Sequence, residues 1–219
     1  FRRHTNFALE CIQNTASGSN TISGNTLVFT ISRNGDLVSN MHLQTDFPQQ
    51  TVTGATTYAN FTNNTGHAYF EDIEMEVGGQ RIDKHYSQWL DIWNEMSDPR
   101  GEQHSLLNKH SAKNAYLKSG SSTQLCGALR TYTPLSFFFC RDSGLALPLI
   151  ALQYHEVRVK VTTRSVISVI NGDGTPASST TSGPNVTLWV DYVYLEKEER
   201  TRMAKSSHTY LIEQVQRVG

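Results

Sequence analysis

Residues 73–93 most constrain the fold, because they have the pattern of two strands, a tight turn and a helix. Over residues 73–77 apolar side chains alternate with glutamates, so one face of a strand is apolar and the other is charged. Gly78 and Gly79 follow, and glycine supplies the positive φ angles that a two-residue hairpin turn needs. The sequence therefore predicts an antiparallel hairpin here, with a short second strand after the turn.

A helix is predicted directly after this hairpin, with Asp83 as its N-cap. The apolar stripe that follows at helical spacing consists of Tyr86, Trp89, Leu90, Trp93 and Met96. The Ser-Asp-Pro sequence at residues 97–99 ends the helix. We interpret Trp89 and Trp93 as core residues, because burial of an indole ring removes a large apolar area from water.

The rest of the chain is rich in strand patterns. Further strands are predicted over residues 6–13, 26–32, 37–45, 131–140, 154–163 and 185–197. Residues 33–36, Arg-Asn-Gly-Asp, indicate a second hairpin that joins the strands on either side of them. Residues 196–206 carry Glu and Arg four positions apart, a pattern typical of an exposed helix.

About eight such strands with turn signals between them predict an all-β fold. We expect an eight-stranded antiparallel sandwich of the jelly-roll type, with one short helix after the Gly78-Gly79 hairpin and a C-terminal linker helix. The loops over residues 14–25, 51–67 and 171–184 are long and rich in Thr, Ser, Asn and Gly, and residues 98–124 form a further polar connection. Long loops on a rigid sandwich commonly carry surface function or lie at an interface.

Composition excludes several classes of function. The chain has 19 basic and 20 acidic residues, without the basic excess typical of nucleic-acid binding. No run approaches the roughly 20 apolar residues of a membrane span. Cys11, Cys126 and Cys140 form no C-x-x-C pair, and the 8 histidines form no H-x-H pair. The sequence thus indicates neither a metal site nor a cofactor.

Five segments, in order along the chain, together resemble one protein family. They are FRRHTNFALE at residues 1–10, ISRNGDLV at 31–38, VGGQRIDKHYSQWLDIW at 77–93, LPLIALQYHEVRVKV at 147–161 and HTYLIEQVQ at 208–216. These sequences are similar to those of the major capsid proteins of nucleocytoplasmic large DNA viruses, a group that includes phycodnaviruses, iridoviruses, mimiviruses and marseilleviruses. The five segments span essentially the whole chain.

The resemblance implies a fold, a role and partners. Members of this family fold as two consecutive jelly rolls, and three copies form a pseudo-hexagonal capsomer. By this resemblance residues 1–197 are the N-terminal jelly roll and residues 198–219 are a linker toward a second jelly roll that is absent from this sequence. We expect a structural protein without a cofactor, assembled in the host cytoplasm and located in the virion shell. Its expected partners are its own copies, first as a homotrimer and then as a lattice, and minor capsid and penton proteins.

Two groups of residues are candidates for a surface role. The candidate subunit contacts are Arg2, Arg3, Gln80, Arg81 and Asp83. For residues 80–83, a local hydrogen-bond network that fixes the hairpin to the helix is an equally good interpretation. The candidate glycosylation sites, which stand in N-x-[ST] contexts in or beside polar loops, are Asn60, Asn63 and Asn185.

Two alternative functions remain open from the sequence. Glu74 and Glu76 project from one strand face roughly 7 Å apart, within the range of paired-carboxylate glycosidases, although a solvated charged strand explains them more simply. A carbohydrate-binding, lectin-like module is the other alternative, because aromatic-rich sandwiches bind sugars by stacking. The aromatic residues in polar loops that would serve it are Tyr58, Phe61, Tyr69 and Phe70.

Overall fold

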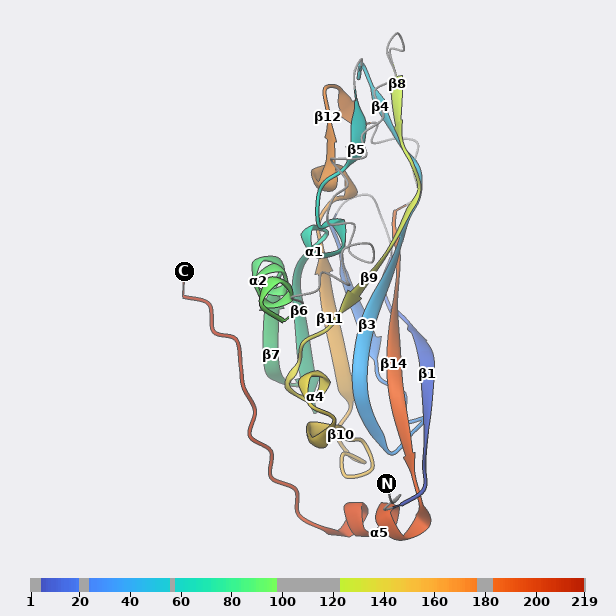
Figure 1. Cartoon of the computed structure of the whole chain (residues 1–219), viewed down its shortest axis with the longest axis vertical. Helices are drawn as coiled ribbons and strands as arrows, with labels where there is room; N and C mark the ends of the chain where they lie inside the picture. The colour runs from blue at the N-terminus through green and yellow to red at the C-terminus, as the bar shows by residue number, and fades with distance from the viewer. Residues whose placement is uncertain (1–4, 20–23, 56–57, 98–122, 177–182, 219) are drawn as a thin grey trace.

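Two antiparallel sheets face each other and enclose the core (Figure 1). The computed structural model describes residues 5–19, 24–55, 58–97, 123–176 and 183–218. The first sheet contains β1 (Phe7–Thr15), β14 (Asn185–Leu195), β3 (Leu37–Phe47), β9 (Leu129–Pro134) and β10 (Leu147–Pro148), the last two both pairing with β3. The second sheet has the order β2 (Thr26–Thr30), β11 (Val157–Thr163), β6 (Phe70–Val77) and β7 (Gln80–Tyr86).

The strand pairing has the nested order of a jelly roll. Among the described residues, the strands of five residues or more are β1, β2, β3, β6, β7, β9, β11 and β14. β1 pairs with β14, β2 with β11, β3 with β9 and β6 with β7. In chain order the first of these strands thus pairs with the last, the second with the seventh, the third with the sixth and the fourth with the fifth. The pairings of β14 with β3 and of β11 with β6 then join the nested pairs into two sheets. The predicted all-β antiparallel jelly roll is therefore confirmed.

Alternation along the strands places the core between the sheets. In β11, Val157, Val159 and Val161 are buried, whereas Arg158 between them is exposed. The same period of two buries Leu188 and its alternate neighbours in β14. Because each fully buried aliphatic side chain contributes roughly 1.5–3 kcal/mol, these two central strands supply much of the stability of the sandwich.

Short strands cap the end of the sandwich that lies opposite α5 (Lys197–Lys205) (Figure 1). One small sheet has the order β13 (Thr175–Pro176), β4 (Gln50–Thr53), β8 (Thr123–Cys126), and another pairs β12 (Ile170–Gly172) with β5 (Ala59–Phe61). The predicted loops over residues 51–67 and 171–184 thus contain short strands. Nearly all of the predicted connection over residues 98–124 lies outside the described residues.

The remaining helices among the described residues are short. They are α1 (Thr65–Ala68), α2 (Ser87–Ser97), α4 (Phe138–Arg141) and the 3₁₀ turns η2 (Ser143–Leu145) and η3 (Val166–Val169). The predicted strand over residues 131–140 is wrong in its second half, because β9 ends at Pro134 and α4 follows. A continuous apolar run has no period that separates strand from helix. Phe137 and Phe139 in this run are fully buried.

The hairpin predicted at residues 33–36 is also wrong. Strands β2 and β3 on either side of it belong to different sheets, so these residues cross from one sheet to the other. The crossing is fixed on β14, because the hydroxyl of Tyr192 donates to the carbonyl of Ser32 (2.7 Å). A Cβ atom on Gly35 would lie 2.8 Å from the Cβ of Tyr192, so only glycine fits here.

Helix α2 begins later than predicted. Strand β7 continues to Tyr86, so Asp83 lies in the strand and the assignment of Asp83 as N-cap is wrong. Leu90 faces the sandwich with 3% of its surface exposed, but Met96 is 73% exposed. Trp89 and Trp93 are half-buried rather than core residues, and their ring centroids lie 5.8 Å apart.

Candidate subunit-contact surface

The β6–β7 hairpin turns at Gly78 (φ 59°) and Gly79 (φ 80°), both in the left-handed region that the sequence predicted. The N–H of Gly78 donates to the carbonyl of Glu156 (2.8 Å), and a Cβ atom on Gly78 would lie 2.7 Å from Nδ1 of His155. The first turn residue therefore packs against the chain that enters β11. Gly79 has no atom of another residue within 4 Å of the corresponding position.

A β-bulge beside this turn separates the side chains of β7. Met75 pairs with Asp83 and Glu76 pairs with Arg81, which leaves Ile82 as an extra residue. Arg81 consequently shares the outer face with the glutamates of β6, and Asp83 shares the inner face with Met75. The exposed Arg81 and the 3%-exposed Asp83 are thus on opposite sides of the sheet.

Ion pairs cross the strands on the outer face of the second sheet. The Nζ atom of Lys84 lies 3.1 Å from Oδ2 of Asp72 and 3.9 Å from Oε2 of Glu74. The other cross-strand pairs are Arg81 with Glu74 (4.0 Å) and Lys160 with Glu76. Arg158 pairs with Glu156, two residues before it on the same segment. Opposite charges on neighbouring strands attract, and each carboxylate in these pairs has a cation beside it. This face therefore has no large field of one sign.

Glu74 and Glu76 are ion-paired and do not form a catalytic couple. The hydrogen bond from Lys160 lowers the pKa of Glu76 below its ordinary value. A glycosidase needs one carboxyl group with a raised pKa as its general acid. The ion pair shifts the pKa in the opposite direction, so the geometry opposes the glycosidase alternative.

Asp83 and His85 form a polar pair buried on the inner side of β7. The Nε2 atom of His85 lies 2.8 Å from Oδ2 of Asp83, and the two side chains are 0% and 1% exposed. The Oδ1 atom of Asp83 accepts hydrogen bonds from the backbone N–H groups of Lys84 (2.8 Å) and Val215 (3.0 Å). Burial raises the pKa of Asp83, but the hydrogen bonds from His85, Val215 and Lys84 outweigh it and leave the pKa below its ordinary value.

The other candidate residues are spread over the molecule. Arg2 and Arg3 lie outside the described residues, and Gln80 is exposed at the hairpin. The three asparagine sites occupy separate elements: Asn60 is in β5, Asn63 precedes α1, and Asn185 is the first residue of β14. Their subunit-contact and glycosylation roles stay predictions.

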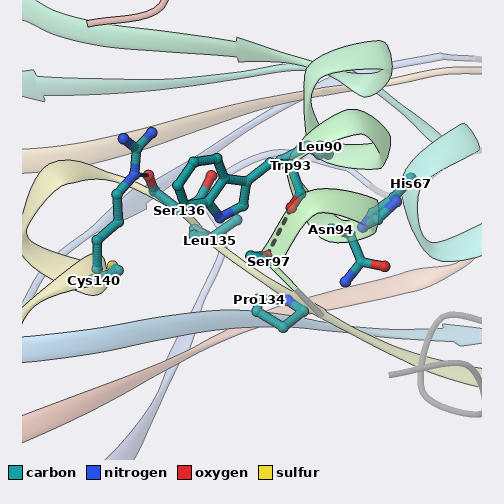
Figure 2. A pocket seen from close by; sticks show the side chains of 10 residues that line it. His67, Leu90, Trp93, Asn94, Ser97, Pro134, Leu135, Ser136 and Cys140 are labelled. Atoms are coloured by element: carbon teal, nitrogen blue, oxygen red, sulfur yellow. Dashed lines mark hydrogen bonds between the residues drawn. The ribbon is translucent and has the colours of Figure 1, made fainter. Parts of the chain in front are cut away.

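A cavity of about 250 Å³ lies beside α2. Figure 2 shows Trp93 and Ser97 of α2 among its lining residues, together with Ser136 and Cys140 from the segment that follows β9. The guanidinium carbon of Arg141 lies 4.2 Å from the centroid of the Trp93 ring. Burial raises the pKa of Cys140 to about 12, so its thiol stays protonated at neutral pH and is a poor nucleophile.

The aromatic residues that would serve a lectin are mostly core residues. The ring of Phe47 packs against Phe61 at 5.2 Å and against Tyr69 at 5.0 Å, and Phe70 is fully buried. Tyr58 alone of the four predicted residues is exposed, at 37%. A sugar-stacking platform needs exposed rings, so the structure gives the lectin alternative little basis.

Among the residues that the structure describes, no group of three or more His, Cys, Asp or Glu side chains is placed to hold a metal ion. None of their helices has the length and apolar character needed to cross a membrane.

The nested order of the strands defines a protein of the jelly-roll class. Comparison with known proteins then identifies the family: the model described as "Major capsid protein N-terminus" matches residues 1–196. The chain belongs to this family of viral major capsid proteins. Its members are structural proteins and not enzymes, which confirms the predicted class of function and removes the lectin alternative.

Individual relatives agree with this assignment. The major capsid protein of Pyramimonas orientalis virus is 40% identical over 221 residues, covering 100% of this chain and 52% of the relative. That of Paramecium bursaria Chlorella virus 1 is 39% identical over 220 residues, covering 100% of this chain and 47% of the relative. The chain therefore spans about half the length of the curated relatives it matches.

Solved structures resemble the chain over nearly its whole length. A quasi-atomic model of the PBCV-1 virus capsid matches with a TM-score of 0.77 and 38% identity, covering 99% of this chain and 49% of that chain. The Faustovirus major capsid protein matches with a TM-score of 0.63 at 13% identity, covering 92% of this chain and 57% of that chain, and so shares the fold.

Proposed function

We propose that this chain is the first jelly roll of a capsid building block of a large icosahedral DNA virus. In this proposal residues 1–197 form the jelly roll and residues 198–219 lead toward a second jelly roll. Three copies of the full-length parent then form a pseudo-hexagonal capsomer. The observation that carries the proposal is the family match over residues 1–196, together with a chain that spans half of its relatives.

The proposed subunit contact uses the tip of the β6–β7 hairpin. Gln80 and Arg81 are exposed there, and Arg2 and Arg3 are proposed to contribute from the start of the chain. In a three-fold assembly each subunit presents different surfaces to its two neighbours. The balanced charge of the nearby sheet face supports close packing of identical copies, because a field of one sign would oppose it.

The wider setting follows from the same proposal. Capsomers assemble in the host cytoplasm without a cofactor and meet minor capsid and penton proteins in the virion shell. Asn60, Asn63 and Asn185 are the proposed sites for sugars. The mass of the intact virion protein checks this last point: an unmodified mass would contradict it.

The mass of the full-length parent in solution tests the capsomer. Light scattering should give three times the subunit mass, and a stable monomer would contradict the proposal. The contact at the hairpin tip is tested by Arg81→Glu, which reverses the charge and should lower the fraction of trimer. The matched control is Arg130→Glu on the other sheet, an exposed arginine that is also paired with a carboxylate, and it should leave the trimer intact. Equal trimer fractions in both variants would remove the hairpin tip from the proposed interface.

A further inference from the structure

Residues 206–218 follow α5 as an extended strap on the outside of the sandwich. The strap has no regular secondary structure, and it runs back along the β7 side of the molecule past α4 (Figure 1). Between the strap and the sandwich lies a cavity of about 400 Å³, lined by Ile82 and Phe138 on one side and by Tyr210 and Ile212 on the other. Most of the side chains of the strap are exposed. Its path must therefore be held by a few specific contacts.

The lower part of the strap is held through α4. The hydroxyl of Tyr210 donates to the carbonyl of Ala146 (3.2 Å), and the Tyr210 ring lies 6.2 Å from that of Phe138. Further along, Arg141 makes a 2.9 Å ion pair with Glu213. Glu213 is 74% exposed, and exposed ion pairs contribute little. The lower contacts thus position the strap without fixing it firmly.

The upper part of the strap is held on β7 by a buried carboxylate. The N–H of Val215 donates to Oδ1 of Asp83 (3.0 Å), and the side chain of Gln214 donates to the carbonyl of Ile82. The guanidinium carbon of Arg217 lies 5.0 Å from the centroid of the Tyr86 ring. Hydrogen bonds to a charged acceptor are about twice as strong as neutral ones, so Asp83 makes the strongest of these contacts.

Asp83 has a feature that a purely local role does not explain. Its other two hydrogen-bond partners, Lys84 and His85, are within two residues of it in β7, whereas Val215 is 132 positions away. Burial of a carboxylate is unfavourable unless its hydrogen bonds are satisfied. Among the described strands β7 is also the edge of its sheet, so without the strap Asp83 would lose a partner and gain water.

A second buried carboxylate, that of Asp36, holds the preceding helix α5 in place through Arg200. Asp36 is 8% exposed and lies 2.9 Å from Nε and 3.0 Å from a terminal nitrogen of Arg200 in α5. It also accepts the backbone N–H of Leu195 (2.8 Å). The bidentate contact of the Asp36 carboxylate with Arg200 fixes the orientation of the guanidinium group as well as its position.

We propose that the hydrogen bond from Val215 to Asp83, called the lock below, holds the strap on β7. Asp83 and Asp36 together fix the direction in which residues 196–218 leave the sandwich. The strap covers the edge of β7 and the apolar cavity behind it, and edge strands left open invite pairing with other chains. That the fixed direction serves a following jelly roll rests on the proposed function. The lock itself is a property of this chain and is tested on it alone.

Hydrogen exchange at the Val215 amide tests the lock, with chymotryptic cleavage after Tyr210 or Leu211 as a second measurement. Asp83→Ala should speed both by about tenfold, the effect of losing a hydrogen bond to a charged group. The matched control is Asp72→Ala, which removes a carboxylate from the outer face of the same sheet and should leave both rates unchanged. Unchanged rates in a folded Asp83→Ala variant would overturn the proposal, and so would an unprotected Val215 amide in the parent chain.

A pair of strap variants keeps the test decisive if Asp83→Ala fails to fold. Gln214→Ala removes the hydrogen bond to Ile82 and should speed exchange at Val215 severalfold. Gln216→Ala, an exposed neighbour, should not. Equal rates in the two variants would overturn the proposal. Neither outcome alters the mass of the full-length parent, so failure of the lock and failure of the capsomer proposal are distinguished.

Discussion

Gly78→Ala and Gly79→Ala should differ in cost although they stand side by side in one turn. Both positions have positive φ, and an alanine there loses about 1–2 kcal/mol to backbone strain. A reduction of unfolded-state entropy returns about 0.4–1 kcal/mol, so Gly79→Ala should destabilise by about 1 kcal/mol. At Gly78 the new Cβ atom would also lie 2.7 Å from Nδ1 of His155. Displacing that ring from its rotamer adds about 1 kcal/mol.

Urea unfolding of the two variants measures this difference. We expect a loss of about 2 kcal/mol for Gly78→Ala and about 1 kcal/mol for Gly79→Ala. The corresponding difference in melting temperature is about 2–4 °C for a chain of this size. The double variant Gly78→Ala, His155→Ala should recover the steric part, and His155→Ala alone is the control. Equal losses at the two glycines, or no recovery in the double variant, would refute the steric argument.

Two other predictions concern charge and packing. Lys160 lowers the pKa of Glu76 in the folded chain. The stabilisation by the ionised carboxylate is therefore complete above the unfolded-state pKa of Glu, about 4.3. It is lost as the pH falls through the lower pKa of the folded state. Glu76→Gln should therefore flatten the acid limb of a stability–pH curve, and an unchanged limb would contradict the ion pair. Phe137→Ala should destabilise by about 3–5 kcal/mol in urea unfolding, because its ring is fully buried and stacks on His85 at 4.7 Å. Tyr154→Ala, at a side chain 94% exposed, is the control and should change stability by less than about 0.5 kcal/mol.

The sequence predicted elements well where one face of a strand is buried and the other is not. The valines of β11 alternate with Arg158 and Lys160, and the structure buries the valines as that period requires. The Gly78-Gly79 turn was predictable for a similar reason, since few residues other than glycine accept its backbone angles. Both signals are local, and tertiary contacts do not oppose them.

The prediction was wrong where distant contacts decide the outcome. The Arg-Asn-Gly-Asp signal at residues 33–36 correctly indicates a change of chain direction, but the strand that pairs with β2 is β11, far along the chain. Burial of Phe137 is likewise compatible with either secondary structure, and the pattern of the run does not choose between them.

The candidate site shows the same limit at single-residue scale. Spacing alone groups Arg81 with Asp83, because alternate residues of a strand share a face. The bulge at Ile82 breaks that rule and sends Asp83 inside, where Val215 reaches it. No feature of residues 80–83 predicts a hydrogen-bond donor from so distant a part of the chain.

The nested pairing of the strands also has a consequence for synthesis on the ribosome. β14 lies between β1 and β3 in the first sheet, so the central strand of that sheet is translated last of the three. Phe7 pairs with Leu195, and at about 5–20 residues per second β1 waits roughly ten to forty seconds for its only strand partner among the described residues. During that interval Phe7 and Leu9, which stay 55% and 65% exposed even in the folded chain, lie on an unpaired strand. The nascent chain is therefore most vulnerable to aggregation until its final strand emerges.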